Sequence, residues 1–129
     1  VGSNYYYTID NPENKKFVEA YKKKFKGVPP GYAGAAGYGL MKMTLLGMQK
    51  SGSTEPQKVI TALEEHKGKN FVGDFEIRGR NHQTVRPFFV LQTKKKNEMK
   101  NQYDMAEVVD VSSTEQPKNI NMCKDIGSF

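Results

Sequence analysis

The sequence predicts an α/β fold, because helix-like and strand-like patterns follow one another along the chain. Two helical patterns joined by a proline-glycine elbow occupy residues 11–52. Apolar and polar side chains then alternate over residues 71–77, and residues 86–93 read RPFFVLQT, which is rich in strand-forming types. We therefore expect helices first and a pair of strands after them.

The first helix is predicted by its end signals as well as by its periodicity. Asn11 is suited to cap it, Pro12 to occupy its first position, and Glu13 to place negative charge near the positive end of the helix dipole. Four apolar residues recur on one stripe, which we expect to face the core: Phe17, Val18, Tyr21 and Phe25. Six lysines between residues 15 and 26 fall largely on the solvent side. Gly27 would end the helix in the left-handed conformation, and Pro29-Pro30 prevents its continuation.

The second helix is expected to begin after Gly31 and to end at Gly52. Four apolar residues define one side of it: Leu40, Met41, Leu45 and Met48. The small residues 33–37 precede them and allow either another helix or a ligand to approach the backbone closely, with packing the favoured alternative. The elbow before this helix is where we expect a ligand site.

Shorter elements are predicted around these two helices. Residues 5–9 (YYYTI) read as a strand by residue type. Thr54 and Gln57 resemble a capping box for a third helix that reaches about His66, and GKN at 68–70 would close it. Residues 71–77 and 86–93 would form a hairpin across the turn at 79–84, residues 106–111 a last strand, and residues 112–129 a polar tail.

Composition is that of a soluble globular domain. The chain has 129 residues, of which 36% are hydrophobic and 26% charged, and no apolar run approaches the length that spans a membrane. The opening VGSNYYYTID lacks the features of a signal peptide, so we expect a mature, cut or partial chain. The net charge of +6 permits nucleic-acid binding, but the excess is nearly all lysine and no known nucleic-acid-binding motif is present. A small basic nucleic-acid-binding module is therefore the weaker alternative.

Catalytic motifs are missing from the sequence. No nucleophile elbow, phosphate-binding loop or dinucleotide fingerprint is present, and we expect no enzyme activity and no catalytic residue. His66 and His82 lack a cysteine or carboxylate at ligand spacing, so we expect neither a metal site nor a cofactor. The single cysteine, Cys123, excludes a disulfide within the chain.

The order of these features resembles the C-terminal portion of type I periplasmic solute-binding proteins of the branched-chain amino acid transporter group. The resemblance is carried by an aromatic helix that ends before a proline, by Tyr38 in the next helix, by the SGST break at 51–54, by Ala62-Leu63, and by a glycine-containing hairpin. It extends over nearly the whole chain, and Asn81-His82-Gln83 is similar to the Asp-His-Gln of one branch of the family.

The resemblance implies part of a two-lobed α/β (Venus flytrap) fold that closes on a small solute and delivers it to an ABC permease. Residues 1–70 would belong to the first lobe, and residues 71–129, the hairpin and tail, to the second. The ligand would be a small carboxylate or amino-acid-like solute, and a ligand-sensing receptor domain of the same fold is the alternative. The resemblance also implies a bacterial protein that is periplasmic or lipid-anchored at the cell surface, and a monomer when full length.

The resemblance also implies candidate ligand-binding residues at the elbow: Gly31, Tyr32 and Ala33. Tyr7, at the end of the expected first strand, is a weaker candidate. The chain departs from the family pattern in two places. Gly39 stands where many relatives have aspartate, and Gly79-Arg80 stand where one branch has a cysteine, which leaves Cys123 without that partner. Ligand identity and the opposite wall of the site are left open.

Overall fold

The computed structural model describes residues 1–64, 66–79 and 81–113. Within them lie three α-helices: α1 (Pro12–Lys24), α2 (Tyr32–Ser51) and α3 (Pro56–Leu63). The same part of the chain holds these strands: β1 (Gly2–Ser3), β2 (Lys67–Asn70), β3 (Gly73–Ile77), β4 (Thr84–Val85), β5 (Pro87–Thr93) and β6 (Ala106–Ser113). A short 3-10 helix, η1 (Lys96–Glu98), lies between β5 and β6. The expected α/β fold is confirmed.

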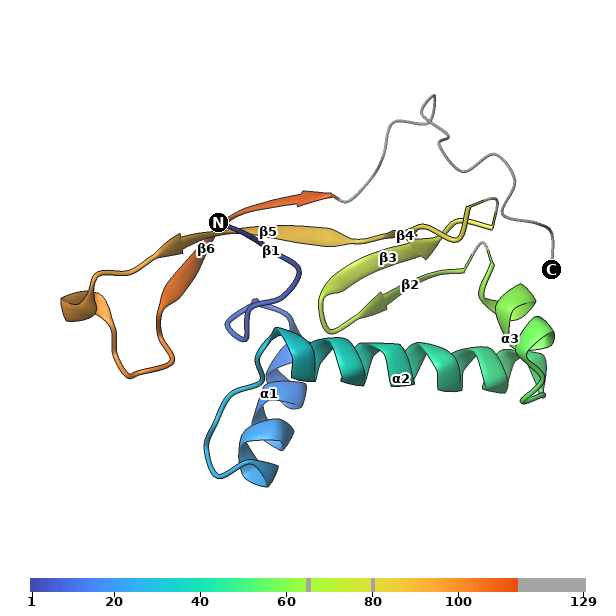
Figure 1. Cartoon of the computed structure of the whole chain (residues 1–129), viewed down its shortest axis with the longest axis horizontal. Coiled ribbons are helices and arrows are strands. Elements are labelled where there is room, and N and C mark those ends of the chain that lie inside the picture. The colour runs from blue at the N-terminus through green and yellow to red at the C-terminus, as the bar shows by residue number, and fades with distance from the viewer. Residues whose placement is uncertain (65, 80, 114–129) are drawn as a thin grey trace.

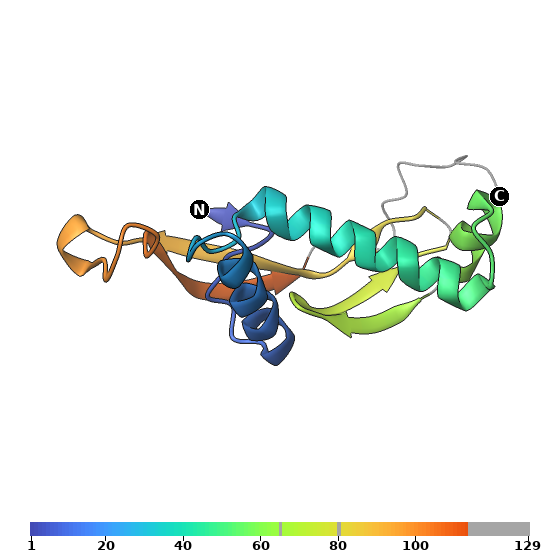
Figure 2. The same ribbon diagram turned by 90° about the horizontal axis from the view of Figure 1, so that it is seen from below.

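The strands form two antiparallel sheets, ordered β1-β5-β6 and β2-β3-β4. Figure 1 shows α2 running along the β2-β3-β4 sheet, with α3 at its far end and α1 crossing near its start. The turned view keeps this arrangement and shows the β5–β6 loop extending away from the helices (Figure 2). The chain passes from one sheet to the other between β4 and β5, at Arg86.

α1 begins as expected. The side-chain Oδ1 of Asn11 accepts hydrogen bonds from the amides of Glu13 at 2.8 Å and Asn14 at 3.3 Å, and Pro12 occupies the first turn. Phe17 and Val18 are buried, which confirms the first half of the predicted stripe. Phe25 is exposed, because the last turn of α1 extends beyond the core.

The core lies where α1, α2 and the turn between β2 and β3 meet. The rings of Phe17 and Tyr38 stack with their centroids 4.3 Å apart, and Phe71 packs against both. Tyr5 closes this cluster from the segment after β1, and Phe89 contributes from β5. Aromatic packing therefore joins elements that are distant in the sequence.

α2 differs from expectation in the side that it exposes. Leu40, Met41 and Leu45 are 70%, 60% and 56% exposed, although they form the apolar side predicted from the sequence. The buried positions of α2 are small residues instead, Ala35 and Gly47. A Cβ on Gly47 would lie 2.8 Å from Val59 Cγ1 of α3, and a Cβ on Gly34 would lie 2.9 Å from the Tyr21 hydroxyl of α1. Close helix packing at small residues, together with the aromatic contacts of Tyr38, thus holds α2 in place.

Several local predictions are wrong. Residues 5–9 form a turn segment rather than a strand, with the Ile9 amide bonded to the Tyr6 carbonyl. Glu55, not Thr54, occupies the N-cap position of α3 and makes no side-chain capping bond; Pro56 lies in the first turn, and the helix ends at Leu63. Residues 67–70 are strand β2, which pairs with β3.

The predicted hairpin is also different. β3 pairs with β2 and β4, whereas residues 87–93 form β5 in the other sheet. The predicted last strand is confirmed as β6 and continues to Ser113. The rest of the polar tail and Cys123 lie outside the described residues.

The two sheets meet closely at Gly73. This residue has a φ of +126°, and a Cβ on it would lie 2.8 Å from Cγ of Pro87, the first residue of β5. The expected division between residues 70 and 71 falls in the turn of the β2–β3 hairpin, where Asn70 pairs with Gly73. The lobe assignment stays a prediction. Among the described residues, no helix has the length and apolar character needed to span a bilayer.

Candidate functional site

A pocket of about 360 Å³ lies between the first half of α2, strand β3 and the segment that follows β1. Its walls come from α2, from the β2-β3-β4 sheet and from the segment after β1, which supplies Asn4 and Tyr5. The pocket is lined by Asn4, Tyr5, Tyr32, Ala35, Ala36, Gly39, Leu40, Met43, Asn70, Phe71, Val72, Phe75, Ile77, Thr84 and Arg86. Its volume lies at the lower end of the range typical of small-molecule sites.

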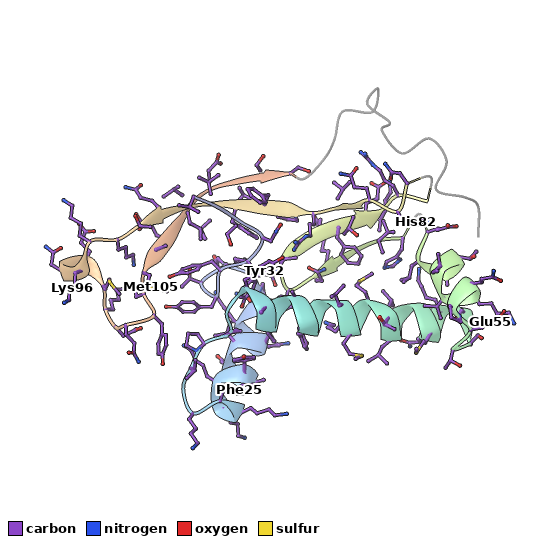
Figure 3. All side chains as sticks on the ribbon, viewed as in Figure 1. Phe25, Tyr32, Glu55, His82, Lys96 and Met105 are labelled. Atoms are coloured by element: carbon purple, nitrogen blue, oxygen red, sulfur yellow. The ribbon has the colours of Figure 1, made fainter. Side chains whose placement is uncertain are left out.

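The elbow between α1 and α2 positions Tyr32 at this pocket. Gly27 has a φ of +87° and donates its amide to the Lys22 carbonyl at 2.8 Å, which ends α1. Pro29 and Pro30 are buried, so the connection is fixed against the core. α2 then begins at Tyr32, which is 57% exposed and lies at the start of the helix, beside α1 (Figure 3).

The polar groups of the pocket are few. Arg86 is the one charged residue among the described residues that line it, and its Nη1 donates to the Asn4 carbonyl at 3.4 Å. Asn70 is held by its neighbours, because its side chain accepts from the Val72 amide and its carbonyl accepts from Asn11 Nδ2. Burial raises the pKa of Tyr5, so its hydroxyl stays protonated and donates to Asn14 at 2.9 Å. The pocket is therefore mainly apolar, with positive charge at one place.

The start of α2 adds to that positive character. Gly31 is its N-cap residue and offers no side chain to the first amides, and no acidic residue lies in the first turn. The amides of a first turn and the helix dipole favour an anion nearby. No described carboxylate lines the pocket to oppose them.

The residues predicted at the site do not all come together. Tyr32 lines the pocket, whereas Gly31 and Ala33 lie next to it in the chain and are exposed. Tyr7 does not line this pocket. Its ring lies 5.0 Å from that of Tyr6, with Lys22 Nζ 5.5 Å from its centroid. Burial, followed by the charges of Tyr6 and Asp104, raises the pKa of Tyr7.

Sequence reasoning missed Arg86, Thr84 and Asn4. Arg86 is one of three arginines in a chain with 20 basic residues, and it directly precedes a strand, which was a usable signal. Thr84 reaches the pocket because β4 pairs with β3, and Asn4 reaches it because the segment after β1 forms one wall. No local pattern marks them.

The other ionisable clusters lie elsewhere. Lys94 pairs with Asp104 at 2.7 Å in the β5–β6 loop, and His82 Nε2 lies 2.8 Å from Glu64 Oε1 at the end of α3. Lys50 Nζ lies 2.7 Å from His66 Nδ1, and burial, with the charge of Lys50, lowers the pKa of His66. Within residues 1–64, 66–79 and 81–113, no group of three or more histidine, cysteine or acidic side chains is placed to hold a metal ion.

Comparison with solved structures shows the same fold. An amino acid ABC transporter substrate-binding protein from Pseudomonas fluorescens Pf-5 is 27% identical with a TM-score of 0.82 over 91% of this chain and 31% of its own. An ABC-type branched-chain amino acid transporter protein from Rhodopseudomonas palustris CGA009 is 26% identical with a TM-score of 0.71 over 85% of this chain and 29% of its own. A solute-binding protein of an ABC transporter from Rhodopseudomonas palustris BisB5 was solved with 3,4-dihydroxybenzoic acid. It is 22% identical with a TM-score of 0.70 over 83% of this chain and 28% of its own.

The chain thus spans about a third of the length of these solved proteins. It matches none of the curated proteins with which it was compared. The sequence profile of the family described as periplasmic binding protein matches residues 1–98, which is most of the chain. The chain belongs to the periplasmic binding protein family, as its predicted resemblance implied.

Proposed function

We propose that this chain is part of a solute-binding protein that captures a small carboxylate or amino-acid-like ligand and delivers it to the permease of an ABC importer. The observation that carries the proposal is the pocket behind Tyr32, which a family of solute-binding proteins would use for capture. It is small, mainly apolar and bordered by one cation, which are the features of a site for a small anionic organic molecule.

The pocket lies between α2, the β2-β3-β4 sheet and the segment after β1, on the part of the chain that precedes β5. Hydrogen bonds of the β2–β3 hairpin cross the expected boundary at residues 70 and 71. We therefore propose, in place of the expected boundary, a division between the lobes near Arg86, where the chain leaves one sheet and enters the other. A ligand in the pocket would contact the part of the chain before this division and Arg86 at the division itself.

Each predicted residue has a distinct part in this proposal. Tyr32 covers the apolar body of the ligand and offers its hydroxyl. Gly31 and Ala33 bring the amides of the first turn of α2 toward the anionic end. Tyr7, which lies outside the pocket, would contribute only through the packing of the segment between β1 and α1.

The wider setting follows from the family. Its members are solute-binding components of transporters, so the proposed partners are the solute and a membrane permease, and the proposed location is the periplasm or the outer face of the membrane with a lipid anchor. The proposed activity is binding without catalysis. The full-length protein would act as a monomer.

The test uses the longest natural chain that contains these residues. Purified protein is denatured, and released small molecules are identified by mass spectrometry and then titrated back by calorimetry. We expect a retained carboxylate or amino acid, and we expect Tyr32→Ala to raise its Kd about tenfold or more, which is the effect of losing a buried aromatic contact. Tyr103→Ala is the matched control, since Tyr103 lies in the β5–β6 loop and does not line the pocket. Binding of no carboxylate or amino acid from a broad panel would contradict the proposal.

A further inference from the structure

We propose that the C-terminal end of α1, residues 22–28 (KKKFKGV), is a contact surface for a membrane that carries anionic lipids. We call these residues the α1 tip. The inference goes beyond the proposed function, because none of these residues lines the pocket. It starts from a projecting helix end on which positive charge and exposed apolar side chains occur together.

The α1 tip projects from the rest of the described structure. Figure 1 shows this end of α1 standing clear of α2 and of both sheets, and in the turned view it again extends past α2 (Figure 2). Phe25 lies at this end (Figure 3) and is 45% exposed, and Val28 is 40% exposed. A Cβ added to Gly27 would meet no atom within 4 Å. Within the described part of the chain, the tip is therefore a convex surface.

The charge of the tip is positive and unopposed. Four of its residues are lysines, and the sequence holds no acidic residue from position 20 to position 54. Lys22 Nζ lies 5.5 Å from the centre of the Tyr7 ring, and none of the four forms an ion pair with a described residue. By contrast, these other lysines are each paired with a carboxylate: Lys15, Lys42, Lys58, Lys67, Lys69 and Lys94. The tip therefore attracts an anionic partner, whose charge also relieves the repulsion among its lysines.

Stabilisation of the helix accounts for the lysines but not for the other features of the tip. Three lysines occupy the last turn of α1, where the helix dipole favours cations. That preference explains neither the exposed ring of Phe25, which packs on Tyr21 at 4.2 Å, nor the left-handed backbone of Lys26, with a φ of +51°. Glycine or asparagine adopts this conformation at lower cost, because a Cβ is unfavourable there. A cation thus stands at a position where glycine would destabilise the fold less.

Lysines beside exposed apolar side chains form the composition of a membrane-surface contact. Lysine ammonium groups attract the phosphates of anionic lipids, while an aromatic side chain enters the boundary between headgroups and acyl chains. A DNA duplex would attract the lysines but would offer Phe25 and Val28 no apolar surface. A convex tip of this size also falls well short of the area of about 800 Å² that each partner buries in a stable protein interface. An anionic membrane is therefore the partner that suits both kinds of side chain.

The contact would be reversible, because a few lysines and one aromatic ring bind a membrane only weakly. It would keep the protein at the membrane in which the proposed permease lies. The pocket would stay accessible to solute, since the tip takes no part in its walls.

The test measures binding to vesicles by sedimentation. The longest natural chain, prepared without a lipid anchor, is mixed with phosphatidylcholine vesicles that contain about 30% phosphatidylglycerol and, in parallel, with pure phosphatidylcholine vesicles. We expect binding to the anionic vesicles to be about tenfold or more stronger, and to fall about tenfold or more when NaCl rises from about 0.1 M to about 0.5 M, because salt screens the lysines. Equal binding to both kinds of vesicle, or no binding to the anionic ones, would overturn the inference.

Substitutions assign the binding to the tip. The combined variant Lys23→Gln, Lys24→Gln and Lys26→Gln should weaken binding to anionic vesicles about tenfold or more. The matched control removes the same charge from exposed lysines of the β5–β6 loop, at positions 95, 96 and 100. It should have little effect, because that loop extends away from the helices (Figure 2) and salt screens charges beyond about 10 Å. An equal loss in both variants would show that net charge alone is responsible and would overturn the inference.

Phe25 separates a membrane from other polyanions. Phe25→Ala should weaken vesicle binding about threefold or more without changing its salt dependence, since it removes only apolar contact. Phe25→Trp should show a blue shift of tryptophan emission, relative to the natural chain, with anionic vesicles but not with pure phosphatidylcholine vesicles. Binding to a DNA duplex that is as tight as binding to anionic vesicles, and unaffected by Phe25→Ala, would overturn the inference.

The outcomes are independent of the proposed function. Each variant should keep the thermal midpoint of the natural chain, because the substituted side chains are exposed. Failure of the natural chain to bind anionic vesicles would leave solute binding untouched. Failure to bind any solute would equally leave the membrane contact standing, since the two measurements report on different surfaces.

Discussion

Asn14 is a fully buried polar residue in the first turn of α1, with 0% of its surface exposed. Its Oδ1 accepts from the Tyr5 hydroxyl at 2.9 Å, and its Nδ2 donates to the carbonyls of Tyr7 at 3.1 Å and Ile9 at 2.9 Å. One amide thus fixes the whole turn segment between β1 and α1. The same hydrogen bonds account for the turn at residues 5–9, where a strand was predicted.

Replacing Asn14 with alanine should lower the free energy of unfolding by about 2–4 kcal/mol, because it leaves a hydroxyl and two carbonyls without their buried partner. Urea unfolding of the longest natural chain measures this. Lys16→Ala, at an exposed position of the same helix, should change stability by no more than about 0.5 kcal/mol. Equal effects of the two substitutions would mean that the Asn14 hydrogen bonds contribute nothing.

Asp104 should make stability depend on pH in the acid range. The hydrogen bond from Lys94 at 2.7 Å, followed by the bond from the Lys100 amide at 3.0 Å, lowers the pKa of Asp104. The carboxylate therefore adds stability above its unfolded pKa of about 4, and this stability is lost as the pH falls through the lower folded pKa. Asp104→Asn should lower the thermal midpoint at pH 7. The difference from the natural protein should shrink as the pH falls below about 4, and a constant difference across the pH range would contradict this assignment.

For single residues, prediction from the sequence succeeded where the hydrogen-bond partners lie only a few positions away in the chain. Asn11 was identified as a cap because the donors to its side chain, the amides two and three residues later, are fixed by the helix itself. Asn14 was not singled out, because its partners belong to a segment whose path depends on the tertiary fold. Arg86 was missed for the same reason.

At the scale of elements, the contact between α2 and α3 depends on Gly47. An ideal Cβ there would lie 2.8 Å from Val59 Cγ1 and 3.0 Å from Leu63 Cδ1. Alanine gains about 1 kcal/mol of helix propensity over glycine, but crowding of this kind costs about 1–3 kcal/mol. The cost of crowding at Gly47 should therefore exceed the gain in helix propensity.

Gly47→Ala should lower the free energy of unfolding by about 1 kcal/mol. Gly37→Ala, in the same helix, should raise it by about 0.5–1 kcal/mol, because nothing lies within 4 Å of a Cβ at that position. Chemical unfolding of both variants gives the comparison. Stabilisation by both would show that α3 is not packed against Gly47 in the way the structure describes.

Elements with their own end signals were predictable from the sequence, and elements made by pairing were not. Pro12 and Gly52 mark helix ends through backbone chemistry that needs no partner. Strand β2 reads KGKN, which has no strand propensity, and it is a strand because β3 bonds to it. Residues 86–93 were recognised as a strand, but the sheet to which they belong is set by β1 and β6, which are far away in sequence.

At the scale of the whole molecule, the exposed side of α2 has the apolar composition of a buried surface. Leu40, Met41 and Leu45 are more than half exposed, and the chain covers only about a third of its solved relatives. Exposed apolar patches of this kind promote association. The sequence pattern identified this side correctly as apolar, but no described residue buries it.

Residues 1–129 produced alone should therefore be poorly folded or should aggregate. We expect strong binding of a hydrophobic dye, a broad elution profile and no cooperative thermal transition. Substituting lysine at Leu40, Met41 and Leu45 should reduce the aggregation without restoring a cooperative transition, because repulsion does not replace packing. A monomeric, cooperative melt of the unmodified segment would contradict this prediction.

The candidate site, too, could be predicted from the sequence only in part, because most of it is formed by the tertiary fold. Tyr32 could be named from the elbow and from the resemblance, whereas the pocket behind it is assembled from β3, α2 and the segment after β1. Its shape depends on how two sheets approach each other, and short-range sequence patterns do not encode that distance.

The close approach of Gly73 to Pro87 limits the distance between the two sheets at this point. Because a Cβ at residue 73 would collide with the proline ring, a single added methyl group would push the two sheets apart at the place where the chain passes between them. The spacing of the two sheets at this point thus depends on a hydrogen atom in place of a side chain. A substitution that never touches the solute could in this way change how far the binding surfaces have to travel.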